Sequence, residues 1–489
     1  MTHFPLDATP ATALLAQLED LRSTDADWRG GRCFALVYSA GEEHEALLRQ
    51  AHQAYFSENG LNPMAFRSLR RMEGELVRMG ADLLRGSPKT SGTVTSGGTE
   101  SLLLAVLAYR NAGKNRLRRG EQPEIVVPAS IHVAVEKAAH LFGVRLRVAP
   151  LAEDYRVDVA AMRALVNRRT VALMASAPQY PHGVVDPIEA IAAFAEERGL
   201  PLHVDACIGG FMLPFMEALG EPVPPWDFRV PGVTSVSADL HKYGFTSKGV
   251  SLLLWRDPSW LRHQFFVSTE WPGGIYASPT LAGTRPAGPI AAAWVCVQAL
   301  GKRGYIDLMR ETLVARDKLV VGLEAIDGVR LLCRPQGTLI AFATSDRRLD
   351  TYALADLLQA KGWHFDRNQQ PASLHLTVMP VHVHTAEAFL QDVREAVAEL
   401  RACPAVRNSG TAPMYGMMAR LPARGLVRSA VMDAMVGMYG PEARDPMAAD
   451  AGSQGWMDRA IQRFGGPLLT LWDRADALRE RVGRRGRGR

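Results

Sequence analysis

Residues 237–242 read Ser-Ala-Asp-Leu-His-Lys, and Lys242 lies 37 residues beyond Asp205, which stands in the stretch His203-Val204-Asp205-Ala206-Cys207. A lysine amine and a buried acid are the two groups that pyridoxal phosphate requires. The amine forms a Schiff base with the cofactor aldehyde, and the carboxylate holds the pyridine nitrogen protonated, so that the ring can accept electrons from a breaking bond. Lys242 and Asp205 therefore predict a pyridoxal phosphate site.

Both stretches lie in a region, from about residue 90 to residue 255, where short apolar runs alternate with helical stretches. Strands that alternate with helices indicate a mostly parallel sheet, and such sheets bind ligands at the carboxyl ends of their strands. The predicted strands cover residues 125–127, 146–149, 171–176, 202–204, 234–237 and 250–255.

The flanking segments indicate further units. Apolar positions at helical spacing predict helices over residues 44–55 and 65–85, and residues 303–326 resemble a long amphipathic connector. Beyond it we expect strands at 329–333, 338–344 and 374–378 beside helices near 350–361 and 385–401. The predicted division is an N-terminal helical arm (1–85), a large cofactor-binding α/β domain (86–320), a small α/β domain (321–425) and a C-terminal helical extension with an arginine-rich tail (426–489).

The composition is that of an ordinary globular protein larger than a single core, with 489 residues, 47% of them apolar and 22% charged. The formal charge of +5 equals the five arginines among residues 481–489, so the rest of the chain is formally neutral. We interpret this tail as a solvated terminus, and the alternative is contact with anionic lipid or nucleic acid.

The cysteines are odd in number, widely spaced and without a CxxC pair, which argues against a disulfide framework and against a zinc site. The first residues lack the pattern of a secretory signal, and no run of ~18 uncharged apolar residues could cross a bilayer. We therefore expect a soluble, cytoplasmic protein with no metal and no transmembrane segment.

A glycine turn at the start of a predicted helix is the candidate phosphate site. Residues 95–101 read Thr-Ser-Gly-Gly-Thr-Glu-Ser and lead directly into an apolar run. Free backbone amides at a helix start, together with the helix dipole, favour a phosphate dianion, and Gly98 and Thr99 are the natural donors. The alternative is an ordinary turn before a helix.

His132 follows a predicted strand, so its imidazole could stack on the pyridine ring, although it could instead cap a helix or lie on the surface. Asp205 could likewise be a helix cap, and we interpret Cys207 as a small core residue rather than a nucleophile. Ser237 and His241 could bond the cofactor phosphate or the substrate. Each of these features is weak evidence alone. Together they follow the order expected for a pyridoxal phosphate site, namely phosphate loop, stacking histidine, acid and lysine, and this order makes the combination specific.

These residues resemble the fold type I pyridoxal phosphate enzymes and, within them, the sphingosine-1-phosphate lyase family of the soluble bacterial type, close to the group II amino-acid decarboxylases. The resemblance runs from about residue 30 to residue 440 and includes Pro-Gln-Tyr-Pro-His-Gly at 178–183, Ser-Pro-Thr-Leu-Ala-Gly-Thr-Arg-Pro at 278–286 and Leu-Arg-Arg-Met-Glu at 69–73. It implies an aspartate aminotransferase-like α/β fold with a large, mostly parallel sheet domain and a smaller C-terminal α/β domain.

The resemblance also implies cofactor contacts, position by position. The phosphate would be held by Gly98 and Thr99, the ring stacked on His132, its nitrogen met by Asp205 and its aldehyde bound by Lys242. Gly283 and Thr284 would reach the phosphate from the neighbouring subunit, which implies a homodimer with shared active sites.

For the substrate, the resemblance implies that Tyr38, Lys248 and Tyr415 line a phosphate site and that Tyr180 lies near the reacting centre. Lys248 fits physically as a point charge for phosphate, and the alternative is a solvated loop lysine. Asn62 stands where many relatives carry histidine. It can donate to a phosphate but cannot be cationic.

The expected function is a retro-aldol lyase that breaks the Cα–Cβ bond of a phosphorylated sphingoid base to give a long-chain aldehyde and phosphoethanolamine. Lys242, Tyr180 and His132 are the predicted catalytic residues, with the first two as candidate proton carriers. We expect a phosphorylated amino-alcohol lipid as substrate and no nucleic acid partner. The alternatives are a group II amino-acid decarboxylase and a non-catalytic protein that uses the arginine tail on a retired enzyme scaffold.

Overall fold

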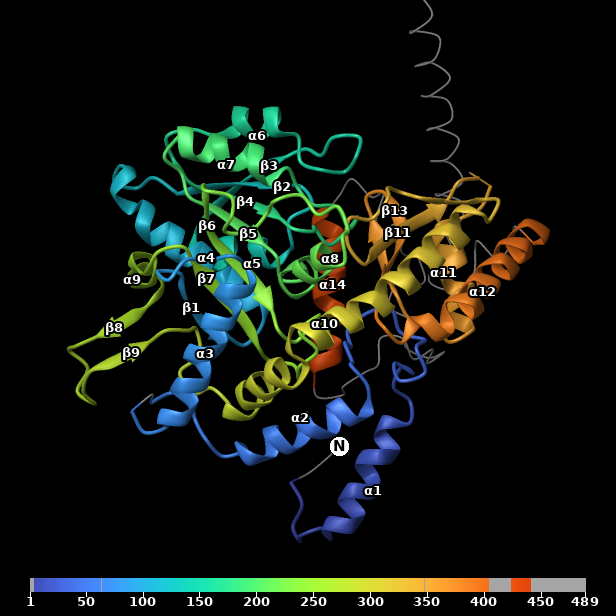
Figure 1. Ribbon diagram of the computed structural model, residues 1–489, viewed down its shortest axis with the longest axis horizontal. Coiled ribbons are helices and arrows are strands. Elements are labelled where there is room, and N and C mark those ends of the chain that lie inside the picture. Colours follow the sequence, from blue (N-terminus) through green and yellow to red (C-terminus); the bar gives the residue numbers. More distant parts are fainter. Residues whose placement is uncertain (1–3, 63, 347, 404–423, 441–489) are drawn as a thin grey trace, which may run out of the picture.

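The computed structural model describes residues 4–62, 64–346, 348–403 and 424–440. Figure 1 shows two layered units side by side, each with its own sheet and helices, and the long helix α10 (Ala287–Glu324) runs between them. The larger unit contains a seven-stranded sheet, and the smaller one contains a four-stranded sheet. This is the predicted α/β fold class, with a large and a smaller domain.

The large sheet has the strand order β1-β7-β6-β5-β4-β2-β3. Only β7 runs against its neighbours, because it pairs antiparallel with β1 and β6 while the remaining pairs are parallel. The strands are β1 (Ser91–Thr95), β2 (Glu124–Pro128), β3 (Arg145–Ala149), β4 (Thr170–Ser176), β5 (Leu202–Asp205), β6 (Val233–Asp239) and β7 (Ser251–Trp255). The mostly parallel sheet and its six predicted strands are confirmed, and β1 is an addition that the sequence analysis did not predict.

Helices bury both faces of this sheet. Along β7, Leu252 and Leu254 join the core on one face, whereas Leu253 and Trp255 join the core on the other. Because both faces are covered, the strands are apolar along their whole length, which is why they stand out in the sequence. The helices packed on the sheet are α3 (Arg67–Leu83), α4 (Gly98–Ala112), α5 (Ala134–Phe142), α6 (Val159–Leu165), α7 (Ile188–Glu197) and α8 (Leu213–Ala218).

The smaller unit is an antiparallel sheet covered by two helices. Its core includes Phe389, whose ring centroid lies 5.0 Å from that of Trp363 and 4.9 Å from that of Phe34. Phe34 comes from the N-terminal region, so this region is anchored to the smaller unit. In the strand order β10-β11-β13-β12, the elements are β10 (Val329–Leu331), β11 (Leu339–Thr344), β13 (Ala372–Thr377) and β12 (Asp366–Gln369), with helices α11 (Thr351–Ala360) and α12 (His382–Ala402).

Peripheral elements complete the chain, and several of them were not predicted. The predicted connector at 303–326 proves to be the second part of α10, which begins at Ala287 and bends at Gly301, where φ is +54°. Gly301 tolerates this left-handed conformation because it has no Cβ. The other elements are α1 (Ala11–Arg22), α2 (Glu42–Ala54), α9 (Leu261–Gln264), β8 (Phe266–Ser268), β9 (Tyr276–Ser278), α14 (Arg424–Tyr439) and the short helices at Gly113–Arg116, Gly209–Phe211 and Pro258–Trp260.

The parallel register brings three strand ends together. Ser176 at the end of β4 is the partner of Asp205 at the end of β5, and Asp205 in turn is the partner of Ser237 in β6. Residues from distant parts of the chain therefore meet at one edge of the sheet, where open α/β sheets bind ligands.

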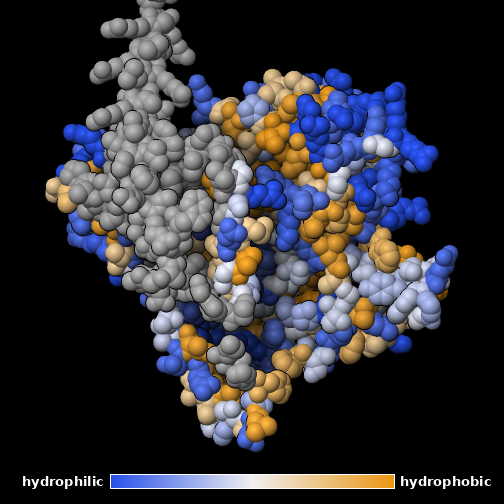
Figure 2. Space-filling model, turned by 180° about the vertical axis from the view of Figure 1, so that it is seen from behind, coloured by the Kyte–Doolittle hydropathy of each residue, from blue (hydrophilic) through white to orange (hydrophobic). Residues whose placement is uncertain are grey.

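Seen from the opposite side, the surface mixes hydrophilic and hydrophobic side chains rather than separating them into one apolar face (Figure 2). Among the residues described, none of the helices combines the length and the apolar character that a bilayer crossing requires.

Candidate cofactor site

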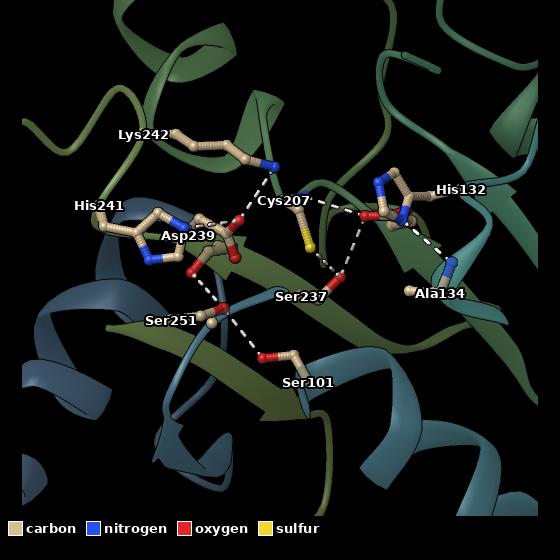
Figure 3. A network of polar contacts seen from close by, with 12 residues as sticks. Ser101, His132, Ala134, Cys207, Ser237, Asp239, His241, Lys242 and Ser251 are labelled. Carbon is tan, nitrogen blue, oxygen red and sulfur yellow. Dashed lines mark hydrogen bonds and ion pairs between the residues drawn. The ribbon is translucent and has the colours of Figure 1, made fainter. Parts of the chain in front are cut away.

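Lys242 follows strand β6 and lies beside a buried acid. Its Nζ is 3.0 Å from Oδ2 of Asp239, and Nε2 of His241 is 3.5 Å from the same oxygen (Figure 3). The Asp239 side chain is only 1% exposed. Asp239 has no predicted role, although an acid at the end of an apolar strand, three residues before a candidate anchor lysine, is a signal that could have indicated one.

Lys242 and Asp239 each stabilise the charged form of the other. Burial works against the ammonium of Lys242, but the Asp239 carboxylate, together with Cys207, Tyr38 and Asp205, outweighs it and raises the pKa of Lys242. Burial likewise disfavours the Asp239 carboxylate, and Lys242 and His241, together with Ser251, outweigh this effect and lower the pKa of Asp239. Lys242 and Asp239 therefore favour the charged form of each other.

Asp205 is oriented by a chain of hydrogen bonds that runs back into the sheet. Its Oδ1 accepts from the backbone N–H of Cys207 at 3.1 Å and from the hydroxyl of Ser237 at 3.4 Å. Ser237 Oγ lies 3.2 Å from Nε2 of His203, whose Nδ1 lies 2.7 Å from Ser235 Oγ. Burial lowers the pKa of His203 to about 4, so this histidine adds no charge behind the carboxylate.

These hydrogen bonds also show the surroundings of Ser237 and Cys207, two residues considered in the sequence analysis. Ser237 is fully buried against Asp205 and His203, and its role at the cofactor phosphate or the substrate stays a prediction. Cys207 is buried, and burial raises the pKa of its thiol well above the ordinary value. A thiol in this state is a poor nucleophile, in line with our interpretation of Cys207 as a core residue.

The amino end of α4 faces this group. Gly97 has φ +150°, and a Cβ added there would lie 3.2 Å from Cε1 of His241. A Cβ on Gly98 would lie 2.8 Å from both Oδ2 of Asp239 and the sulfur of Cys207. The two glycines therefore keep open a narrow space beside the first-turn amides of Gly98 and Thr99, which precede the hydrogen-bond ladder of the helix.

His132 lies between β2 and α5 on the other side of the Cys207 and Ser237 contacts from Lys242 (Figure 3). Its Nδ1 accepts a hydrogen bond from the backbone N–H of Ala134 at 3.2 Å. This bond orients the imidazole while leaving its faces and Nε2 for a ligand.

Two of the residues predicted for the substrate, Tyr38 and Lys248, lie near Lys242, and Tyr180 lies near Tyr38. Lys248 Nζ lies 4.9 Å from the ring centroid of Tyr38 and donates to the carbonyl oxygen of His241 at 3.1 Å. The charge of Lys242 acts on the pKa values of both Tyr38 and Lys248. Burial raises the pKa of Tyr38 to about 12, whereas burial and the charge of Lys242 lower that of Lys248 to about 8. The Tyr180 hydroxyl donates to Oδ2 of Asp366, a residue that the sequence analysis did not name.

The remaining predicted residues form a second cluster, built from the loops around residues 59–62 and 281–285. The Asn59 amide donates to Thr284 Oγ1 at 3.3 Å, and a Cβ added to Gly283 would lie 2.9 Å from the Tyr276 hydroxyl. Asn62 Oδ1 accepts from the backbone N–H of Met64 at 2.9 Å. The contacts described for Gly283, Thr284 and Asn62 are with neighbouring residues of these loops and with Tyr276 of β9, and not with Lys242. Tyr415 lies outside the described residues.

These side chains suit pyridoxal phosphate as a set. The lysine amine, the oriented carboxylate of Asp205 and the glycine-lined helix end provide a covalent anchor, an anion for the ring nitrogen and a phosphate cradle. They come from the ends of two neighbouring strands, β5 and β6, and from the amino end of α4. The residues present therefore fit the cofactor that the sequence predicted.

Comparisons with known proteins agree with this fit. The family model of the pyridoxal-dependent decarboxylase conserved domain matches residues 19–345. The chain is 41% identical to sphingosine-1-phosphate lyase 1 of Rattus norvegicus over 417 residues, which cover 84% of this chain and 72% of the rat protein. It is 40% identical to the sphingosine-1-phosphate lyase of Arabidopsis thaliana, with 87% of this chain and 79% of the plant protein covered.

Solved structures place the fold in the same group. The sphingosine-1-phosphate lyase of Burkholderia pseudomallei superposes with a TM-score of 0.81 at 37% identity, covering 90% of this chain and 97% of that chain. The glutamate decarboxylase of Lactobacillus brevis superposes with a TM-score of 0.73 at 24% identity, covering 82% of this chain and 95% of that chain, a likeness of fold alone.

We predict that Lys242 is the residue to which the cofactor becomes attached. After incubation with pyridoxal phosphate and reduction with borohydride, mass spectrometry of peptides should find the added mass on Lys242 in the wild type and nowhere in Lys242→Ala. Lys248→Ala is the matched control, because it removes a neighbouring amine, and it should still be labelled on Lys242. Label on Lys248 in the wild type would contradict the assignment.

Proposed function

The chain belongs to the sphingosine-1-phosphate lyases within the pyridoxal-dependent decarboxylase family, and on this premise we propose that it cleaves the Cα–Cβ bond of a phosphorylated sphingoid base to a long-chain aldehyde and phosphoethanolamine. It is a pyridoxal phosphate-dependent carbon–carbon lyase. The observation that carries the choice of substrate is the second amine, Lys248, which lies with Tyr38 beside Lys242. A second cationic side chain near the anchor lysine suits the phosphate group of a substrate.

Pyridoxal phosphate, when bound, supplies a ring that takes up the electron pair of the breaking bond. Asp205 would offer a fixed anion to the ring nitrogen, and His132 would offer a flat face to the ring. Gly98 and Thr99 would present backbone amides to the cofactor phosphate. Lys242 would be the covalent anchor, and its amine would be able to move a proton at the cleaved carbon.

The substrate side of the site decides which bond breaks. The bond that lies perpendicular to the cofactor ring is the one that is activated, and this orientation depends on how the substrate phosphate is gripped. We propose that Lys248 and Tyr38 bind the substrate phosphate, with Asn62 and Tyr415 as further contacts. Tyr180 is proposed to lie at the hydroxyl that becomes the aldehyde.

We also propose a homodimer with shared active sites. The hairpin formed by β8 and β9 projects from the large domain (Figure 1) and exposes 58% of Trp271 and 79% of Ile275. Helix α1 buries none of its residues, and its leucines are exposed. Exposed apolar side chains of this kind are typical of surfaces that a partner covers, and a second copy of the chain would bring the cluster of Gly283 and Thr284 to the cofactor phosphate.

The proposed function is tested by the products. Incubation of the cofactor-loaded protein with a phosphorylated sphingoid base should release a long-chain aldehyde and phosphoethanolamine in equal amounts, measured by mass spectrometry. A group II decarboxylase would instead release carbon dioxide from an amino acid. A protein that carries the cofactor and forms neither aldehyde nor phosphoethanolamine would refute the proposal.

We predict that Lys248 gives the enzyme a distinctive pH dependence. The free enzyme should lose kcat/KM as the pH rises through about 8, because Lys248 then loses the charge that binds the substrate phosphate. Lys248→Arg, which stays charged, should remove this decrease, and Lys248→Ala should have low turnover at every pH with the cofactor absorbance intact. The same decrease in the wild type and in Lys248→Arg would exclude Lys248 as its source.

Shared sites predict complementation between two inactive variants. Lys242→Ala lacks the anchor, and Thr284→Asp places a negative charge where the partner's cofactor phosphate is expected, so each homodimer should be inactive. A mixed dimer has one site with both residues intact, and random mixing should restore about a quarter of wild-type activity. Thr284→Ser, which keeps the hydroxyl, is the control. Mixed dimers that form and stay inactive would argue against sharing.

A further inference from the structure

Tyr180 is held by two residues of the smaller domain. Its hydroxyl donates to Oδ2 of Asp366 in β12, and its ring centroid lies 4.2 Å from that of His375 in β13. Asp366 and His375 are cross-strand partners in the sheet, so one register positions both. The site therefore receives a carboxylate from a domain that contributes none of the cofactor contacts.

The segment that carries Tyr180 is fixed at the mouth of the large sheet. It follows β4, and the backbone N–H of Ala177 donates to the carbonyl oxygen of Asp205 at 2.9 Å. On the other side, the Asn368 amide donates to the carbonyl oxygen of Pro181 at 2.8 Å. Tyr180 thus lies where the two domains meet, within reach of the group formed by Tyr38 and Lys242.

The surroundings keep Tyr180 neutral. Burial and the adjacent Asp366 carboxylate raise the pKa of its phenol, and the phenols of Tyr38 and Tyr243 act in the same direction. His375 is fully buried, which lowers its pKa, so it adds no positive charge that would favour a tyrosinate. A neutral phenol can accept a proton only if it passes its own proton on, and the Asp366 carboxylate is the acceptor to which that proton is directed.

We propose that Asp366 is the positioning residue that makes Tyr180 the base for the substrate hydroxyl, by taking the phenol proton as Tyr180 Oη accepts the hydroxyl proton. This inference rests on the proposed carbon–carbon cleavage and deepens it. The substrate O–H bond breaks and a Tyr180 O–H bond forms, while the original Tyr180 O–H bond breaks and an Asp366 O–H bond forms. The electron pair of the hydroxyl becomes the carbonyl of the aldehyde.

The hydrogen-bond direction supports this sequence. Because Tyr180 donates its proton to Asp366, its Oη retains lone pairs that can accept the proton of the substrate hydroxyl. After the aldehyde has left, Asp366 gives its proton back to Tyr180 while Tyr180 releases the proton from the substrate hydroxyl to water, which restores the Asp366 carboxylate and leaves the phenol neutral. Lys242 then remains for the second proton transfer, at the carbon that stays with phosphoethanolamine.

The test separates hydroxyl deprotonation from the other steps. Asp366→Asn keeps a hydrogen-bond acceptor for Tyr180 but cannot take a proton under these conditions. We expect kcat for cleavage to fall by about 10²–10⁴-fold, with KM unchanged. A second assay follows by NMR the exchange of the carbon-bound hydrogens of phosphoethanolamine in D₂O. This exchange involves no substrate hydroxyl and so needs no base for one. It should continue in Asp366→Asn at the wild-type rate. The visible spectrum of the bound cofactor should also be unchanged.

Asp392→Asn is the matched control. Asp392 is a partly buried acid of the same domain that accepts a hydrogen bond from the indole N–H of Trp363 at 2.7 Å, so its replacement tests for a general effect on the domain. It should cleave like the wild type. Asp366→Glu should recover part of the lost activity, because it restores a carboxylate. Tyr180→Phe is the second variant, which interrupts the relay from the other end and should lose cleavage while keeping exchange.

Two outcomes would overturn the role of Asp366. One is full cleavage by Asp366→Asn, which would show that the carboxylate is dispensable. The other is a parallel loss of cleavage and exchange in both Asp366→Asn and Tyr180→Phe, which would indicate a purely structural effect. If the wild type itself exchanges phosphoethanolamine hydrogens but cleaves no phosphorylated sphingoid base, the proposed function fails, and the inference fails with it.

Discussion

A partly buried ammonium facing a buried carboxylate at the end of the central sheet is the contact around which the site is built. Removing one partner from such a pair leaves an uncompensated charge, at a cost of about 3–5 kcal/mol when burial is complete. Lys242 and Asp239 avoid this cost together, because each stabilises the charged form of the other. The fold must therefore hold β6, its following turn and the amino end of α4 in one arrangement.

The narrow space beside this pair is preserved by the absence of side chains. At Gly98, even a methyl group would meet the carboxylate of Asp239 and the sulfur of Cys207. The same absence leaves the backbone amides at the start of α4 accessible to a phosphate. A helix end, a lysine and an acid from neighbouring strands thus lie close enough to form a single binding site.

The smaller domain adds chemistry rather than only covering the site. Through Asp366 and His375 it holds the Tyr180 side chain, while the backbone of the same segment is bonded to the strand end that carries Asp205. A relative movement of the two domains would displace the Tyr180 hydroxyl from the cofactor residues. The orientation of one phenol is in this way coupled to the contact between domains.

Local patterns in the sequence predicted six strands of the large sheet and the helix start at Gly98, because strands buried on both faces are continuously apolar and glycine turns precede helices directly. The roles of Asp205 and Lys242 stay predictions. These patterns did not predict β1, the β8–β9 hairpin or α1, whose short or polar segments depend on their neighbours for their structure. Asp239 and Asp366 illustrate the same limit within the site. The sequence shows that a residue is an acid, but its role depends on the group that folding brings next to it. For Asp239 this group is the amine of Lys242, three residues away, and for Asp366 it is the phenol of Tyr180, 186 residues away. The sequence by itself thus determined the cofactor chemistry and its candidate lysine and acid, Lys242 and Asp205. Tertiary structure alone placed Asp239 beside the lysine and Asp366 beside Tyr180, because electrostatic and hydrogen-bond contacts depend on distance in space.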